Sequence, residues 1–338
     1  MSGGLWLQRV AKRLAGAAVL AAAGFLAAAC AGGPPAASAD GPAAAVPSTR
    51  TPEPARAADP MAPRSLPRMA WTLTSPSGAV AFVQGTLHLG SDALYPLDRT
   101  VTEALAAADL ALGELSSADM ERSTGVILER MSFSLLSRGR TLDTLLSAEE
   151  LAYLKGALGA EGYRFVSVYR PWVAYSYLDG VAAAKAGLSA ERGVDAALYA
   201  AAASVGKAVA GLESIESQLD VLAGPSEELQ TALLRDSVRE YRARPEAIGE
   251  LYEAYRKDDR RGLARAVAEA LSRSNAFSKD LAAFNDSLLD KRNKAWAERI
   301  DALMKDGKRL FIFAGVAHFV GEGSVLELLK AKGYTVRP

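Results

Sequence analysis

The pattern of apolar and polar positions divides this chain into a few short strands and many helices. Short apolar runs between turn residues are typical of buried strands, whereas apolar positions three or four residues apart indicate helices. We predict strands at residues 71–74, 79–84, 109–115, 207–212, 309–314 and 334–336. The run at 309–314 is the most apolar, which predicts a central strand, and the last run predicts an edge strand.

Amphipathic segments fill most of the remaining chain. Residues 118–187 and 225–307 are predicted to be almost entirely helical, with breaks at Arg170-Pro171 and Arg244-Pro245, because proline cannot continue a helix. We therefore expect an α/β fold in which a mixed central sheet is flanked by helices and carries a large helical insertion.

The two histidines of the chain follow predicted strands in similar sequence contexts. Gly85-Thr86-Leu87-His88 comes after the strand at 79–84, and Gly315-Val316-Ala317-His318 comes after the strand at 309–314. Ligands of α/β sheets lie outside the strand ends, where such residues meet. Either histidine alone is more typical of a hydrogen-bonded turn residue, but their matching positions favour one shared site.

Two carboxylates also lie at predicted strand ends. Glu114 ends the strand at 109–115, and Glu213 follows the strand at 207–212. Imidazole is a common metal ligand and a general base near neutral pH, so the histidines indicate either a shared metal or paired acid/base groups. Two histidines with one carboxylate leave room on a metal for water. The chain has no His-Glu-x-x-His helix, no Gly-x-Ser-x-Gly turn and no phosphate-binding glycine-rich loop.

The N-terminal 30 residues have the form of an export signal. Basic residues precede an apolar run at residues 14–29, which ends in small residues before Cys30, the only cysteine. This arrangement predicts a lipoprotein signal peptide over residues 1–30 and lipidation of Cys30. Gly32, where retained lipoproteins have Asp, then indicates the outer membrane; cleavage at an Ala-x-Ala site into the periplasm is the alternative.

A linker and one folded domain account for the rest of the chain. Residues 31–68 are rich in Ala, Pro, Ser and Gly and poor in large apolar residues, which predicts a disordered tether. The folded domain is expected over residues 69–338. The chain has 39 basic and 39 acidic residues, a balance that gives no sign of nucleic-acid binding.

An ordered series of motifs resembles the TraB/PrgY/GumN family, which includes the Tiki metalloproteases. The series comprises residues 85–90, 112–115, 193–195 (Gly-Val-Asp), 211–218, 292–293 (Arg-Asn), 314–321 and 328–336. The resemblance implies an α/β fold like that of the erythromycin esterase and haem-binding ChaN group, with two pseudo-equivalent halves.

The resemblance also implies a site and an activity. In Tiki proteins the paired Gly-x-x-His motifs and a glutamate serve metal-dependent cleavage of peptide bonds, so His88, His318 and Glu114 are the expected ligands of Mn²⁺, Co²⁺ or Zn²⁺. Glu213 is expected as a second carboxylate, and Arg292 as the group that stabilises a substrate or an oxyanion. We therefore expect a lipid-anchored, metal-dependent hydrolase acting on a peptide or protein. The alternative is a non-catalytic envelope protein that binds a peptide, haem or metal in the same cleft.

Overall fold

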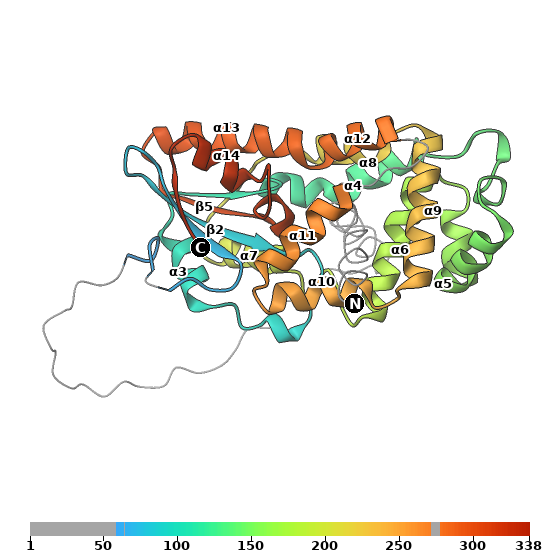
Figure 1. Cartoon of the computed structure of the whole chain (residues 1–338), viewed down its shortest axis with the longest axis horizontal. Coiled ribbons are helices and arrows are strands. Elements are labelled where there is room, and N and C mark those ends of the chain that lie inside the picture. The colour runs from blue at the N-terminus through green and yellow to red at the C-terminus, as the bar shows by residue number, and fades with distance from the viewer. Residues whose placement is uncertain (1–58, 64, 272–277) are drawn as a thin grey trace, which may run out of the picture.

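The structure is a computed structural model that describes residues 59–63, 65–271 and 278–338. The described chain forms two lobes along its longest axis, one built on a β-sheet and one built from helices (Figure 1). Helices α12 (Ser278–Asn285) and α13 (Lys291–Lys305) extend from the sheet toward the helical lobe.

Six strands form one mixed sheet in the order β4-β3-β5-β2-β1-β6. Their bounds are β1 (Ala70–Thr74), β2 (Val80–Thr86), β3 (Leu110–Gly113), β4 (Val209–Gly211), β5 (Leu310–Gly315) and β6 (Thr335–Arg337). Strands β4, β3, β5 and β2 are parallel, whereas β1 is antiparallel to both β2 and β6. The four parallel strands therefore end at the same edge of the sheet, where ligand sites of α/β folds are built.

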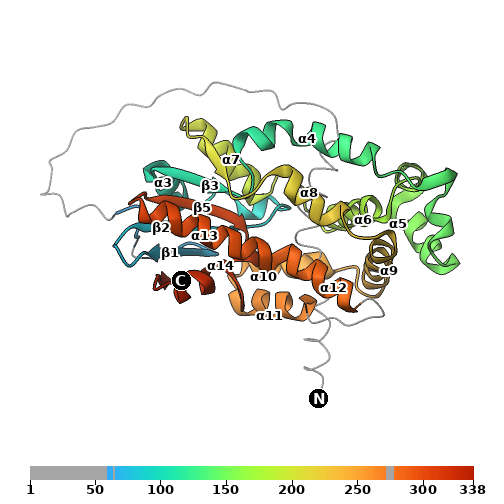
Figure 2. The same ribbon diagram turned by 90° about the horizontal axis from the view of Figure 1, so that it is seen from above.

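Helices cover both faces of the sheet. Helices α3 (Arg99–Ala107) and α7 (Val194–Ser204) lie on one face, and α13 and α14 (Val325–Ala331) lie on the other (Figures 1 and 2). Helices α10 (Ala247–Arg256) and α11 (Arg260–Leu271) lie near the ends of the parallel strands. This two-sided arrangement follows from right-handed connections that run in opposite directions along the sheet.

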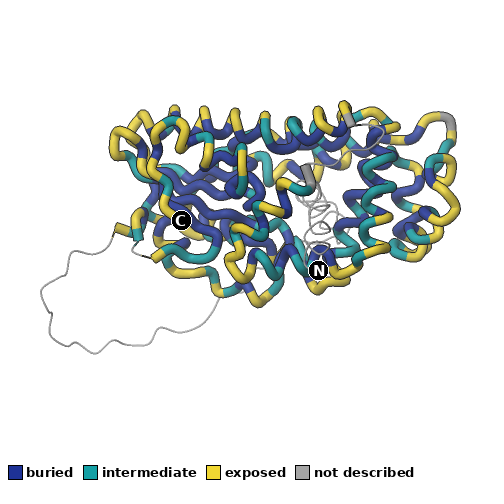
Figure 3. The backbone as a smooth tube through the Cα atoms, viewed as in Figure 1, coloured by how far each residue is buried: buried dark blue, intermediate teal, exposed yellow. Residues whose placement is uncertain are grey.

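The helical lobe has its own apolar core. It consists mainly of α5 (Ala148–Val166), α6 (Pro171–Lys185) and α9 (Glu227–Ala243), while α4 (Ser117–Ser132) and α8 (Ile215–Ala223) connect it to the sheet. One cluster of buried apolar residues surrounds the sheet and a second fills this lobe (Figure 3). Trp172, Tyr163 and Tyr175 belong to the second cluster, so the aromatic residues of this region pack a core.

The predicted fold class is confirmed as a mixed sheet flanked by helices. Strand β5 is an inner strand with residues 310–314 fully buried, and β6 is an edge strand, as predicted. The helix predicted across 225–307 contains a feature that its sequence did not indicate, the π-helical segment η5 (Asp286–Asp290). The similarity to the erythromycin esterase and ChaN group and the two pseudo-equivalent halves stay predictions.

Packing of the domain begins before residue 69. Met61 is fully buried in the sheet core, and Arg337 donates a hydrogen bond to the carbonyl of Pro63. The predicted signal peptide, Cys30 and most of the predicted linker lie outside the described residues. Among the described helices, none is both long and apolar enough to cross a membrane.

Candidate functional site

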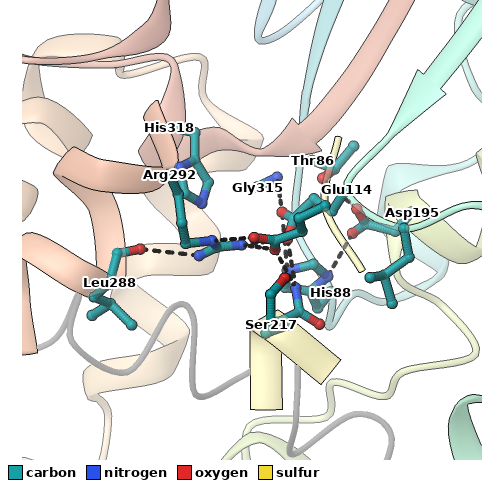
Figure 4. Close-up of polar contacts among 12 residues, drawn as sticks. Thr86, His88, Glu114, Asp195, Ser217, Leu288, Arg292, Gly315 and His318 are labelled. Atoms are coloured by element: carbon teal, nitrogen blue, oxygen red, sulfur yellow. Dashed lines mark hydrogen bonds and ion pairs between the residues drawn. The ribbon is translucent and has the colours of Figure 1, made fainter. Parts of the chain in front are cut away.

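Four of the predicted site residues follow the ends of the four parallel strands. His88 follows β2, Glu114 follows β3, Glu213 follows β4 and His318 follows β5. Arg292 reaches the same place from α13 and contacts Glu114 (Figure 4) as well as Glu213. The fold thus brings together all five residues, although 230 positions separate the two histidines.

Glu114 is the centre of this hydrogen-bond network. The backbone N–H of Gly315 donates to Glu114 Oε1 (2.7 Å), and Arg292 Nη2 and Gln218 Nε2 donate to its Oε2 (3.1 and 3.0 Å). His88 Nε2 lies 3.7 Å from Oε1. Burial disfavours the charged carboxylate, but the positive charges of His88 and Arg292 outweigh it and hold the pKa of Glu114 below its usual range. Glu114 is therefore a fixed, ionised group.

Arg292 joins the two glutamates in a buried ion-pair cluster. Its Nη2 and Nε donate to the two oxygens of Glu213 (2.5 and 2.9 Å), and its Nη1 donates to the carbonyl of Leu288 in η5 (3.0 Å). Burial raises the pKa of Glu213, although Arg292 opposes that shift. With its bond to Glu114, Arg292 uses four of its five N–H groups inside the protein. Its main structural effect is to position the carboxylates.

Asp195, in the first turn of α7, orients His88. Asp195 Oδ2 lies 3.1 Å from His88 Nδ1, and Thr86 Oγ1 donates to Asp195 Oδ1 (2.6 Å). Burial disfavours the imidazolium, but the charge of Asp195 outweighs it and raises the pKa of His88 to about 9. The ring therefore turns Nδ1 toward Asp195 and Nε2 toward Glu114. Gly193 permits this approach, because a Cβ there would lie 2.4 Å from the carbonyl oxygen of His88.

Asn293 orients the second histidine. Asn293 Oδ1 lies 2.6 Å from His318 Nδ1, while Asn293 Nδ2 donates to the carbonyl of Gly323 (3.0 Å). Because the amide nitrogen faces a carbonyl, the amide oxygen faces the histidine, and Nδ1 of His318 must carry the hydrogen. Burial and the positive charge of Arg292 lower the pKa of His318 to about 3, so this ring is neutral. Its Nε2 is left with a free lone pair.

Gly315 leaves open the space that these side chains share. A Cβ added at Gly315 would lie 3.1 Å from Glu114 Oε1, 3.7 Å from His88 Nε2 and 3.9 Å from His318 Cδ2. The second Gly-x-x-His motif therefore needs glycine for close approach, while its local structure differs from that of the first motif. His318 lies in a 3-10 turn after β5, whereas His88 lies in a bend after β2.

The chemistry of these groups fits a divalent metal. Nδ1 of each histidine lies against an oxygen of the protein, which is how metal-ligating histidines are usually held. Glu114 Oε1 adds an anionic oxygen beside them. Within the described ranges, no three His, Cys, Asp or Glu side chains already have the arrangement of a formed metal site. Metal binding would therefore require these side chains to move toward one another and Nε2 of His88 to give up its proton.

A cavity opens onto the same residues. It has a volume of about 60 Å³, which is room for about four water molecules. Its polar side consists of Thr86, His88, Glu114, Arg292 and His318. The remaining wall is mostly apolar and includes residues of α10, α11 and η5.

Sequence reasoning missed three residues that support the site. Asp195 and Asn293 orient the two histidines, and Gln218 donates to Glu114 and to Glu213 (3.0 and 3.2 Å). All three lie in segments that belong to the recognised motif series, at 193–195, 292–293 and 211–218. That membership was the available signal, but only the fold shows which side chain each residue contacts.

All residues of the candidate site lie within the part of the chain that matches one protein family. The chain matches the TraB/PrgY/gumN family over residues 69–338, a span that includes both histidines and every residue that orients them. The chain belongs to the TraB/PrgY/gumN family. The resemblance that its motifs indicated is thus confirmed.

Relatives of this TraB/PrgY/gumN protein cover most of its length. An uncharacterized protein of Treponema pallidum is 28% identical over 275 residues, which are 78% of this chain and 81% of the relative. The uncharacterized protein YbaP of Escherichia coli is 27% identical over 261 residues, or 76% of this chain and 90% of YbaP. The metalloprotease TIKI2 of Xenopus tropicalis is 42% identical over only 55 residues, 16% of this chain and 10% of TIKI2. No solved structure matches the chain.

Proposed function

We propose that this protein is a metal-dependent hydrolase that cleaves peptide bonds. The observation that carries the proposal is the approach of three groups to the space beside Gly315: Nε2 of His88, Oε1 of Glu114 and the Cδ2–Nε2 edge of the His318 ring. Family membership and the local similarity to the metalloprotease TIKI2 support a hydrolase that acts on peptides.

His88, His318 and Glu114 are the residues that would hold the metal. Two imidazole nitrogens and one carboxylate suit Zn²⁺, Co²⁺ or Mn²⁺. A metal bound there supplies a Lewis acid for the peptide carbonyl and for water. Asp195 and Asn293 keep the two Nε2 atoms directed at the site.

The remaining groups balance charge around the three metal ligands. Glu213 balances the charge of Arg292 and keeps the guanidinium in place. We propose that the remaining N–H of Arg292 Nη1 donates a hydrogen bond to a substrate oxygen. This gives Arg292 and Glu213 supporting roles beside the three metal ligands.

Location in the cell envelope is a separate part of the proposal. The apolar run at residues 14–29 and Cys30 support export and a lipid anchor in the outer membrane. Incorporation of labelled palmitate into the wild-type chain but not into Cys30→Ala is the expected result. A soluble periplasmic wild-type protein without label would instead indicate ordinary signal cleavage.

The metal and the activity are tested together on the full chain purified in detergent. Elemental analysis after loading with Zn²⁺, Co²⁺ or Mn²⁺ measures binding, and mass spectrometry of a peptide library measures cleavage. We expect the double variant His88→Ala with His318→Ala to lose both, and Lys294→Ala, an exposed neighbour on α13, to keep both. Unchanged binding and cleavage in the double variant would overturn the proposal.

One observation favours the alternative of a binding protein without turnover. Glu114 already accepts three hydrogen bonds, and much of the cavity wall is apolar. In this alternative the same cleft holds a peptide, haem or a metal without turnover. A protein that retains metal or peptide but cleaves no member of the library would support this alternative.

A further inference from the structure

One side of the cavity is built from aliphatic side chains. Ile248 and Leu251 come from α10, Leu263 comes from α11 and Leu289 comes from η5; we call these four residues the apolar wall. All four are buried, with at most 8% of their surface exposed. They line the same cavity as the two histidines and Glu114, so a molecule that reaches those groups enters a space that the wall also borders.

The charged groups of the cavity already have partners on the protein. Arg292 is paired with Glu114 and Glu213, and His88 is paired with Asp195. The lining residues outside this polar side carry no charged side chain. A charged substrate side chain placed against the wall would therefore lose its hydration without gaining a partner, which is strongly unfavourable.

The size of the cavity limits what can fill it. Room for about four water molecules matches the volume of one branched aliphatic side chain. Tyr252 also borders the cavity, but its hydroxyl is hydrogen-bonded to Ser91 Oγ (2.7 Å). That hydroxyl is thus already engaged with the protein, and the contact also fixes α10 next to the residues that follow β2.

We propose that the site selects peptides with an aliphatic side chain, of the size of Val, Leu or Met, next to the bond that is cleaved. The apolar wall binds this side chain while the peptide carbonyl faces His88, His318 and Glu114. The inference rests on the proposed peptidase function and adds the substrate class. It predicts strong discrimination, because one methylene more or less in such a pocket changes kcat/KM roughly 10-fold.

The test uses the metal-loaded full chain and a peptide on which the library has shown cleavage. Matched peptides carry Leu, Ala, Phe or Lys at one of the two positions that flank the cleaved bond, and kcat/KM is measured for each. We expect the Leu peptide to exceed the Ala and Lys peptides at least about 10-fold at one of these positions. Leu251→Ala should lower kcat/KM for Leu and raise it for Phe, because it enlarges the pocket.

Controls separate this inference from the function on which it rests. Leu128→Ala removes a side chain on α4 that is 54% exposed and should leave the preference unchanged. Ile248→Val deletes one methylene from the wall and serves if Leu251→Ala fails to fold. A kcat/KM for the Lys peptide that equals or exceeds that for the Leu peptide would overturn the inference. It would leave the proposed peptidase function unaffected. The absence of cleavage of every peptide in the library would overturn both.

Discussion

The amide oxygen of Asn293 lies 2.6 Å from Nδ1 of His318, and this contact determines which nitrogen of the histidine faces the cavity. The other end of the same amide is bonded to the carbonyl of Gly323, so the amide cannot turn over without losing that bond. His88 is held by a carboxylate, Asp195, at the corresponding nitrogen. The two histidines therefore present equivalent atoms to one space while differing in charge.

The tautomer of His318 is the first prediction. In the metal-free protein, ¹⁵N NMR spectra should show hydrogen on Nδ1 and none on Nε2, with the ring neutral between pH 5 and 8, because burial and Arg292 lower its pKa to about 3. Only two histidines contribute signals, and His318→Ala assigns them. A His318 that carries its hydrogen on Nε2 would contradict the geometry.

Asn293→Ala extends the same test to metal binding. It removes the acceptor for Nδ1, so we expect mixed tautomers and a loss of roughly 10- to 100-fold in metal affinity. Titration calorimetry measures the affinity, and Lys294→Ala, one residue further along α13 and exposed, is the matched control. Equal affinity in both variants would count against an orienting role for Asn293.

Arg292→Ala should strongly destabilise the fold. It leaves the buried carboxylates of Glu114 and Glu213 without their shared counter-ion, which typically costs about 3–5 kcal/mol of unfolding free energy. Arg99→Ala breaks an exposed pair with Glu103 and should cost at most about 1 kcal/mol. Urea unfolding of both variants measures the difference, and a similar small loss in each would show that the buried cluster contributes little.

Gly193→Ala tests the close approach of α7 to the loop that carries His88. The new Cβ would lie 2.4 Å from the carbonyl oxygen of His88 and 3.0 Å from that of Ala190, so the loop must move. We expect lower thermal stability and weaker metal binding. Gly125→Ala adds a methyl group in open space on α4 and should raise stability by up to about 1 kcal/mol. Wild-type metal affinity in Gly193→Ala would contradict the close packing.

Asp179 on α6 makes stability depend on pH in the helical lobe. Burial raises its pKa to about 7, although a hydrogen bond from Tyr241 opposes the shift. Its folded pKa thus exceeds the unfolded value of about 3.9, so its contribution is complete below about pH 4 and is lost as pH rises through 7. Relative to Asp179→Asn, the wild type should lose about 2–3 kcal/mol of unfolding free energy between pH 5 and 8. If urea unfolding shows the same pH dependence of unfolding free energy in the wild type and in Asp179→Asn, this prediction is wrong.

The sequence by itself was sufficient to predict the strands, the fold class and the candidate residues at the strand ends. Buried strands such as β5 are short apolar runs, and turn chemistry marks their ends, so both signals are local. Because parallel strands end at one edge, the positions of His88, Glu114, Glu213 and His318 followed from that pattern. The family was likewise recognisable from its motifs.

Only the tertiary structure decided how those residues are held. The contacts of Asp195 with His88 and of Asn293 with His318 join segments from different helices and strands, and no local pattern encodes such pairings. The same holds for the pairing of Arg292 with both Glu114 and Glu213, and for the apolar wall of α10, α11 and η5. Hydrophobic burial and hydrogen-bond satisfaction act on the whole chain at once, and these long-range contacts are determined at that level.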